Sequence, residues 1–357
     1  MINVKIIKNA VDAVLNKKKI LSTSYSGKTE DIGTANRFDI ADTVIVKKQR
    51  GKDFIILNLT DIHFSDYDYR AFFAFESTMT AKQLVRRVKP DLITVTGDIV
   101  CGDSTHFSIQ RFTNLMNSFG TPWAPVFGNH DGEANCDKNH LADIMMQSPY
   151  CLMKKGDPEM GVGNYCIGIA HEKPDGTPDI VEALIMLDSH STQANPTQVA
   201  WYSRVCDEIN RYSDNNAEIA AFFHVPLAQY RYAYDELFDA QNKVWKNGCG
   251  GYGDCFEKIC CEYDSDGIPV DRGLFEAIKK SGTTKHVICG HEHMNDFSVL
   301  YKGIRLTYTL KIGFGSGFQK GFNGGTVITV GENGIKRITH KSRIGPRLKN
   351  ILSIDTK

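Results

Sequence analysis

Short apolar runs that end abruptly in polar residues constrain the fold of this 357-residue chain more than any other feature of its sequence. Each run is long enough for a β-strand and too short for most helices. Near-continuous apolarity of this kind is typical of strands covered on both faces, which predicts strands inside a layered domain. The runs begin at Phe54, Leu92, Ala124, Glu182, Glu218 and Lys285.

Helical patterns lie between several of these runs. Asn195 is a candidate N-cap, because a proline and then a glutamine follow it and apolar residues recur at helical spacing beyond them. A second helical pattern begins at Asp271 and stops at Gly282. Alternating strands and helices predict an α/β fold.

No internal repeat or low-complexity linker divides the chain. We therefore expect one domain over residues 37–357, preceded by an N-terminal extension over residues 1–36. Residues 228–270 carry little periodicity and contain the Gly-rich sequence NGCGGYGDC, which predicts a loop insertion with about one helical turn. The strand-like segments from Ile304 and Thr326 have no helical pattern between them and predict a second, more antiparallel sheet.

The charge balance argues against a nucleic-acid or membrane partner, because 42 basic residues (Lys and Arg) offset 42 acidic ones (Asp and Glu). No apolar stretch approaches the roughly 20 residues of a membrane helix, and the N-terminus lacks the apolar segment of a secretory signal. These features predict a cytoplasmic protein, with secretion as the alternative if a leader has been removed.

Four cysteines form a cluster whose spacing fits no familiar zinc module, although they could form disulfides in an exported protein. The cluster comprises Cys249, Cys255, Cys260 and Cys261.

Polar residues with metal-binding groups follow five of the six runs directly. Because ligands bind outside the carboxyl ends of strands in open α/β sheets, these side chains are predicted to meet at one edge. Glycines stand before several of them, where the chain must leave a strand sharply. The runs lead, in order, into Asp61-Ile62-His63, Gly97-Asp98, Gly128-Asn129-His130-Asp131, His224 and Gly290-His291-Glu292-His293.

Two carboxylates, an amide oxygen and at least four imidazoles exceed the four ligands that close a structural zinc site. They suit two metal ions a few ångströms apart, with one carboxylate bridging both. Alone, each residue has a structural alternative, such as a turn cap or a satisfied strand-end histidine. The motifs DxH and GD are weak, whereas a given four-residue word such as GNHD occurs by chance in on the order of 0.2% of chains this long. Coincidence at every strand end would be needed to explain the whole set.

In this order, DxH, GD, GNHD, a lone His and GHxH resemble the calcineurin-like metallophosphoesterase superfamily. The sequences PWAPVFGNHD, GVGNY, LDS, and DRGLFEAIKK followed by CGHEHMNDF resemble its purple-acid-phosphatase-like branch. The resemblance extends from about Phe54 to Val330. It implies a four-layer α/β/β/α sandwich, in which two mixed sheets are flanked by helices and a dimetal site lies at one edge.

The resemblance also implies a role for each motif residue. His130 would stabilise or protonate the departing oxygen without binding a metal, and Asp131 would support the site from nearby. Seven residues would bind metal: Asp61, His63 and His293 the first ion, Asn129, His224 and His291 the second, and Asp98 both.

Cys101 marks a departure from true purple acid phosphatases, which have a metal-binding Tyr at that position and lack the histidine that this chain has at His63. We therefore expect no purple colour and a metal pair drawn from Fe, Mn and Zn.

These features predict a phosphoester hydrolase in which a hydroxide bridging the metals attacks phosphorus in line. The preferred substrate is a phosphomonoester, either a small molecule or a phosphoprotein. One alternative is a phosphodiesterase or nuclease, although the balanced charge counts against a long polynucleotide. The other is a non-catalytic scaffold that retains the fold, against which the complete set of ligands counts.

Overall fold

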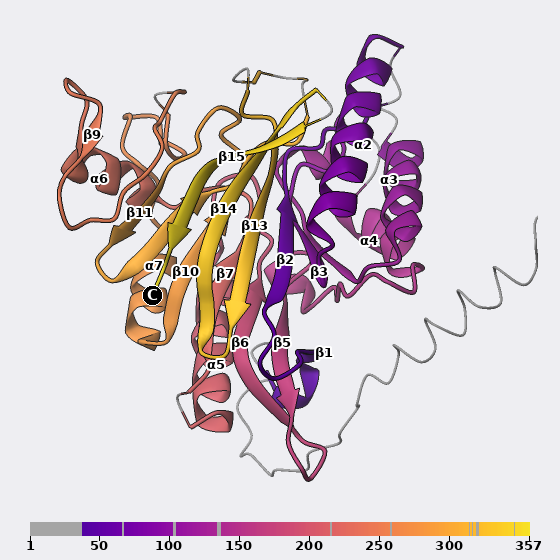
Figure 1. Cartoon of the computed structure of the whole chain (residues 1–357), viewed down its shortest axis with the longest axis vertical. Coiled ribbons are helices and arrows are strands. Elements are labelled where there is room, and N and C mark those ends of the chain that lie inside the picture. The colour runs from indigo at the N-terminus through magenta and orange to yellow at the C-terminus, as the bar shows by residue number, and fades with distance from the viewer. Residues whose placement is uncertain are drawn as a thin grey trace, which may run out of the picture.

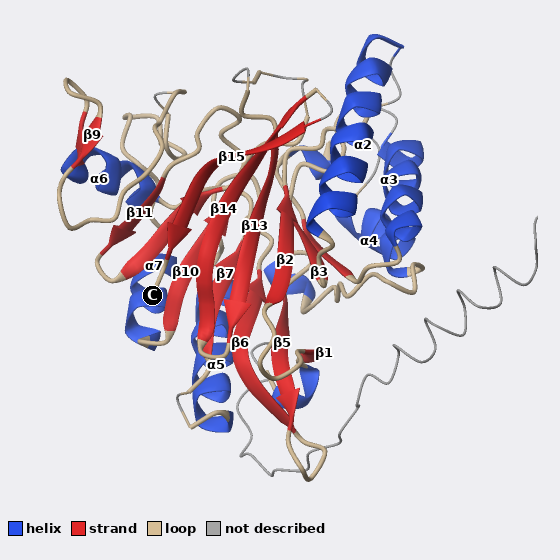
Figure 2. Ribbon diagram, viewed as in Figure 1, coloured by secondary structure: helices blue, strands red, loops and turns tan. Residues whose placement is uncertain are grey.

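The computed structural model describes residues 38–65, 68–102, 105–133, 137–214, 216–257, 259–313, 315, 317–318, 321–345 and 347–357, without the side chains of residues 68–73 and 105. The N-terminal extension predicted over residues 1–36 lies outside the described residues. Two large mixed sheets pack face to face, with helices on both outer sides (Figures 1 and 2).

The first sheet has seven strands, in the order β1-β5-β6-β7-β10-β12-β11. Helices α5 (Pro196–Tyr212), α6 (Ala228–Leu237) and α7 (Leu274–Ser281) lie along its outer side. Its strands are β1 (Val44–Lys47), β5 (Tyr165–Glu172), β6 (Pro178–Met186), β7 (Glu218–Phe222), β10 (Thr284–Cys289), β12 (Ile304–Tyr308) and β11 (Ser298–Tyr301).

The second sheet has six strands, in the order β15-β14-β13-β2-β3-β4. Helices α2 (Asp68–Val88), α3 (Thr105–Phe119) and α4 (Lys138–Met146) flank it, and short 3-10 turns occur at η2 (Ile40–Asp42), η3 (His130–Gly132) and η4 (Pro158–Met160). Its strands are β15 (Arg347–Asp355), β14 (Gly334–Ile344), β13 (Gly324–Gly331), β2 (Phe54–Leu59), β3 (Leu92–Thr96) and β4 (Trp123–Val126).

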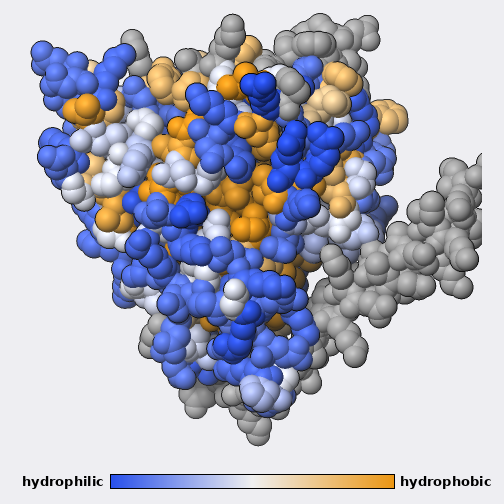
Figure 3. Space-filling view, viewed as in Figure 1, coloured by the Kyte–Doolittle hydropathy of each residue, from blue (hydrophilic) through white to orange (hydrophobic). Residues whose placement is uncertain are grey.

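Two apolar cores hold these layers together. One lies between the sheets and under α2, α3 and α4, and the other lies between the seven-stranded sheet and α5, α6 and α7. β14 touches β6 and β7 across the interface between the sheets. This arrangement confirms the predicted α/β/β/α sandwich. In Figure 1, α2, α3 and α4 lie at the right, beside β2 and β3, whereas β14 and β15 lie to the left of these helices, and Figure 3 shows apolar residues in the middle of the same view.

The local sequence explains where α5 and α7 begin and end. Asn195 Oδ1 accepts a hydrogen bond from Gln198 N at 2.9 Å and Gln198 Oε1 accepts one from Asn195 N at 2.7 Å, which confirms the predicted cap of α5. The start predicted for α7 at Asp271 is wrong, because Asp271 Oδ1 accepts a hydrogen bond from Gly273 N in a turn that precedes the helix. The predicted stop at Gly282 is confirmed by its left-handed φ of 72°.

The strand-like segments from Ile304 and Thr326 do not share a sheet. β12 is parallel to β10 in the seven-stranded sheet, whereas β13 is antiparallel to β2 in the other. The prediction of one additional antiparallel sheet is therefore wrong. The chain crosses between the sheets at this point. Thr309 N donates a hydrogen bond to Cys289 O, which ends β10, and three residues later Ile312 N donates one to Thr60 O, which follows β2.

The segment predicted as a loop insertion over residues 228–270 contains more regular structure than its sequence suggested. It begins with the ten-residue helix α6 and continues through a small hairpin of β8 (Phe238–Asp239) and β9 (Val244–Trp245). Tyr230 anchors α6, because its ring is buried and its hydroxyl donates to Val287 O at 3.1 Å. Among the described residues, every helix falls short of the length and apolarity that crossing a membrane requires.

Candidate metal centre

The ends of β2, β3, β7 and β10 meet at one edge of the sandwich. Asp61 N donates to Gly97 O at 3.1 Å, which links the chain after β2 to the chain after β3. His224 Nδ1 donates to Thr96 O at 2.8 Å, and Gly290 N donates to His224 O at 3.2 Å. These contacts bring residues from both sheets to the same place.

Several of the predicted site residues have left-handed backbones. The φ angles are 53° at Asp61, 50° at His63, 50° at Asp98 and 78° at His291. Non-glycine residues seldom adopt such angles. Where they do, the position is often a functional site, because the surrounding structure has to hold the strained backbone in place. Here each turn directs a polar side chain across the sheet edge.

The first group of side chains surrounds Asp61. His293 Nε2 lies 3.2 Å from Asp61 Oδ1, and His63 Nε2 lies 3.8 Å from the same oxygen. The two imidazole nitrogens are 3.2 Å apart. Ligand atoms of Asp61, His63, Asp98 and His293 all lie within 4.8 Å of one another, a spacing that allows them to hold one metal ion.

A second group lies beside the first. His291 Nδ1 is 3.0 Å from Asn129 Oδ1 and 3.2 Å from His224 Nε2. Asp98 joins the two groups, because its Oδ2 lies 3.3 Å from His224 Nε2 and 3.5 Å from His63 Nε2. The seven predicted metal-binding residues thus form two adjacent groups that share one carboxylate.

The chemistry of these groups fits a pair of metal ions. Asp61 Oδ1 is buried and lies 3.2 Å from His293 Nε2 without a hydrogen bond of good geometry, so a cation bound between the two atoms would stabilise both groups. Imidazole, carboxylate and amide oxygen are ligands that Zn, Mn and Fe accept. Two nitrogen pairs converge at hydrogen-bond distance, as ligands of a shared cation do.

The electrostatics keep the carboxylate of Asp98 charged. Burial opposes its ionisation, yet His224 and His63 hold its pKa well below the ordinary value. Burial would lower the pKa of His224, but the adjacent Asp98 raises it to about 9. A carboxylate that stays ionised in a buried site is suited to bind a cation.

His130 lies at the solvent side of the two groups. Its side chain is 39% exposed, and its Nε2 lies 3.9 Å from Asp98 Oδ2. Its Nδ1 lies 2.7 Å from Glu133 Oε1, and its backbone N donates to Asp98 Oδ1 at 3.0 Å. The ring is therefore oriented by Glu133 and stands beside the candidate centre.

Asp131 lies beneath the centre, with its carboxylate directed at backbone groups. Oδ1 accepts hydrogen bonds from Ile99 N at 2.8 Å and Val100 N at 2.9 Å, and Oδ2 accepts one from Gly128 N at 2.7 Å. Burial, together with Asp98, raises the pKa of this carboxyl to about 6. Asp131 ties the loop after β3 to the loop after β4, and Glu133 is the acid that contacts the His130 ring.

Two glycines make the close approach of these loops possible. A Cβ at Gly128 would overlap the carboxylate of Asp98, and a Cβ at Gly97 would lie 2.7 Å from Gly128 N and from the His224 side chain. Gly97 also has a φ of 81°. Any larger residue would displace a predicted ligand, which agrees with the sequence-based reason for these glycines.

Three residues outside the motifs also contact the centre. Lys311 is buried, donates from Nζ to Asp61 O at 3.1 Å and has its pKa lowered to about 8 by burial. Glu262, from the insertion, contacts His291, and Glu133 contacts His130. Of these three residues, only Glu133 could have been expected from the sequence to contact the site, because it follows His130 by three residues.

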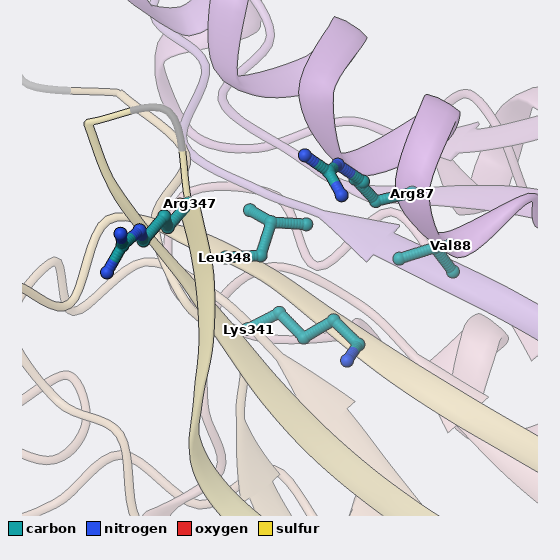
Figure 4. Close-up of a pocket in the computed structure, with 5 residues that line it drawn as sticks. All are labelled: Arg87, Val88, Lys341, Arg347 and Leu348. Carbon is teal, nitrogen blue, oxygen red and sulfur yellow. The ribbon is translucent and has the colours of Figure 1, made fainter.

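Cys101 and a surface groove lie outside the two groups. Cys101 is buried, and its Sγ donates to His63 O at 3.7 Å. A groove of about 300 Å³ lies between the end of α2 and the strands β14 and β15 (Figure 4). None of the predicted site residues is among those that line it, which are Arg87, Val88, Lys341, Arg347 and Leu348.

Comparison with known proteins also indicates a phosphoesterase. The calcineurin-like phosphoesterase family model matches residues 54–295. An Arabidopsis thaliana protein named "Probable inactive purple acid phosphatase 29" is 24% identical over 299 residues, covering 72% of this chain and 71% of that protein. "Phosphatase DCR2" from Saccharomyces cerevisiae is 29% identical over 280 residues, covering 68% of this chain and 44% of that protein.

The fold of a solved structure agrees as well. A dimetal phosphatase from Danio rerio superposes with a TM-score of 0.53 at 11% identity, covering 85% of this chain and 99% of that one. The family match includes the five motifs and more than half of the chain. The chain therefore belongs to the calcineurin-like phosphoesterase family, and it is a metallophosphoesterase.

Proposed function

We propose that this protein is a phosphomonoesterase that uses two metal ions, and that the two groups described above hold them. The observation that carries the proposal is the position of Asp98, whose Oδ2 lies within 3.5 Å of an imidazole from each group. A carboxylate shared in this way is the arrangement that a dinuclear centre needs. The first ion would be held by Asp61, His63 and His293 and the second by Asn129, His224 and His291, with Asp98 available to both.

The residues around the centre divide the remaining work. When bound, the cations supply Lewis-acid activation of water and neutralise charge on the phosphoryl oxygens. His130 stands beside the centre with Nε2 on the side of Asp98, where it protonates the leaving oxygen, while Glu133 holds its Nδ1. Asp131 holds the ligand loops in register through three backbone N–H groups.

Cys101 bears on the metal identity. It occupies the position of the tyrosine that binds metal in true purple acid phosphatases, and its thiol is directed at the His63 carbonyl. We therefore expect a colourless enzyme whose metals come from Fe, Mn and Zn.

The preference for monoesters is supported by the names of the relatives. The yeast relative is named a phosphatase, and the Arabidopsis relative is named a probable inactive purple acid phosphatase. The present chain has the full predicted set of ligands together with His130, which supports activity here. The substrate is proposed to be a small phosphate ester or a phosphoprotein.

The test is an assay of purified protein of measured metal content against a monoester, a diester and a phosphopeptide, each with added Fe, Mn or Zn. We expect two metal ions per chain and a kcat/KM for the monoester at least about tenfold above that for the diester, equal to about 1.4 kcal/mol of transition-state preference. Chelator-treated protein is the control and should be inactive. A strong diester preference would replace phosphatase with phosphodiesterase, and metal-loaded protein inactive on all three substrates would indicate a scaffold.

A further inference from the structure

Glu262 connects the insertion over residues 228–270 to the candidate metal centre. Its Oε1 lies 2.7 Å from His291 Nε2, at the far side of the ring from the other ligands. The opposite ring nitrogen, Nδ1, faces Asn129 and His224. A neutral imidazole has one N–H. If that N–H is at Nε2 and donates a hydrogen bond to Glu262, the lone pair of Nδ1 is directed at the second group.

The backbone on both sides of Glu262 is held in place. Asn295 Nδ2 donates to Ile259 O at 2.7 Å, and the buried Tyr308 hydroxyl donates to Cys260 O at 2.6 Å. On the other side, Val270 N donates to Glu262 O at 2.9 Å. These contacts fix where the carboxylate stands, which a positioning group requires.

We propose that Glu262 is a positioning residue that orients His291 to bind the second metal ion. This rests on the proposed function, because it requires His291 to be a metal ligand. A carboxylate that accepts the hydrogen bond of a ligating imidazole fixes its tautomer and ring orientation and raises its basicity. Glu262 lies outside the five motifs, so this role would connect the insertion to the metal centre.

The experiment measures metal binding directly, by titrating apoprotein with Zn²⁺ or Mn²⁺ against a competing chelator dye. Loss of such outer partners costs roughly 10–100-fold in metal affinity. The Glu262 side chain is 32% exposed, so water replaces part of its effect. We therefore expect the dissociation constant of the second ion, and not that of the first, to rise about tenfold in Glu262→Ala. Glu262→Gln keeps an oxygen that accepts the Nε2 proton and should recover most of the affinity.

Glu236→Ala is the matched control, because Glu236 is an exposed acid at the end of α6 in the same insertion. It should leave both dissociation constants unchanged. Equal affinities in Glu262→Ala and wild type, with two ions bound to each, would overturn the role of Glu262 alone. Wild-type protein that binds fewer than two ions would instead overturn the proposed dinuclear function.

A separate observation concerns two cysteines in the same insertion. The Sγ atoms of Cys255 and Cys260 are 2.8 Å apart and both side chains are buried, so a small further approach brings them to the roughly 2.05 Å of a disulfide. We infer that these two residues form a disulfide during folding when a disulfide oxidant is present. With glutathione disulfide, two thiol–disulfide exchanges form the Cys255–Cys260 bond and release two molecules of glutathione.

Peptide mapping tests this pairing. The full chain is refolded with glutathione disulfide, remaining thiols are alkylated, and trypsin cleaves after Lys246, Lys258 and Arg272. We expect peptides 247–258 and 259–272 to be linked in wild type and in Cys261→Ser, and unlinked in Cys255→Ser and in Cys260→Ser. Fully alkylated Cys255 and Cys260 in wild type, or a link that persists in Cys260→Ser, would overturn the inference.

Discussion

Asp98→Asn is expected to lose both metal ions and at least about 10³-fold in kcat/KM. The carboxylate is proposed to bridge the ions, and its Oδ2 lies between imidazoles of both groups. An amide keeps the shape but removes the negative charge. Metal ions contribute several kcal/mol of transition-state stabilisation, and each 1.36 kcal/mol changes the rate tenfold.

Metal analysis and thermal melting distinguish this loss from unfolding. With chelator present, Asp98→Asn and wild type should melt within a few degrees of each other. Added metal should raise the melting temperature of wild type only, because a ligand stabilises the state that binds it. Asp179→Asn makes the same chemical change at an exposed ion pair with Arg50 and should behave as wild type. An Asp98→Asn protein that retains two ions would rule out a bridging role.

His130→Ala is expected to keep both metal ions and to lose about 10²–10³-fold in kcat, within the usual range for removal of a general acid. The ring stands beside Asp98 without belonging to the closely spaced ligand atoms, so its removal leaves the metal-binding groups intact. The loss should be larger for an alkyl phosphate than for an aryl phosphate. A good leaving group needs less help from a proton donor.

Glu133→Gln provides the graded control for this variant. Its amide oxygen can still accept the hydrogen bond from His130 Nδ1, so we expect a much smaller loss of kcat than in His130→Ala. Metal content and the ratio of the two substrate rates are the measurements. If His130→Ala lost a metal ion, or lost the same factor on both phosphates, His130 would act as a ligand or a packing group rather than as an acid.

Much of the fold was predictable because its signals are local. The runs from Phe54 and Leu92 became β2 and β3, and Asn195 caps α5, since each depends on neighbouring residues alone. β15 escaped prediction, because much of it is polar and exposed. The assignment of β12 and β13 to one sheet failed, because a chain that crosses between sheets leaves no periodic pattern.

The candidate site was predictable to a similar extent. Its motif residues stand at strand ends, where the type of side chain and a preceding glycine are visible in the sequence. Lys311 and Glu262 were missed, because they contact Asp61 and His291 only through folding, in the case of Lys311 across 250 residues. Asp131 illustrates the intermediate case, since its place in GNHD was clear but its three backbone partners were not.

The amino-acid sequence by itself determined that Asp, Asn and His follow buried strands in a fixed order, and hence the family and the groups available to bind metal. Only the tertiary structure decided which of these groups share Asp98, that Glu133 rather than Asp131 contacts the His130 ring, and that the insertion reaches His291. The physical reason is that residue types and their spacing are properties of short segments. Distances between side chains at a sheet edge depend instead on strand register and on how two sheets pack.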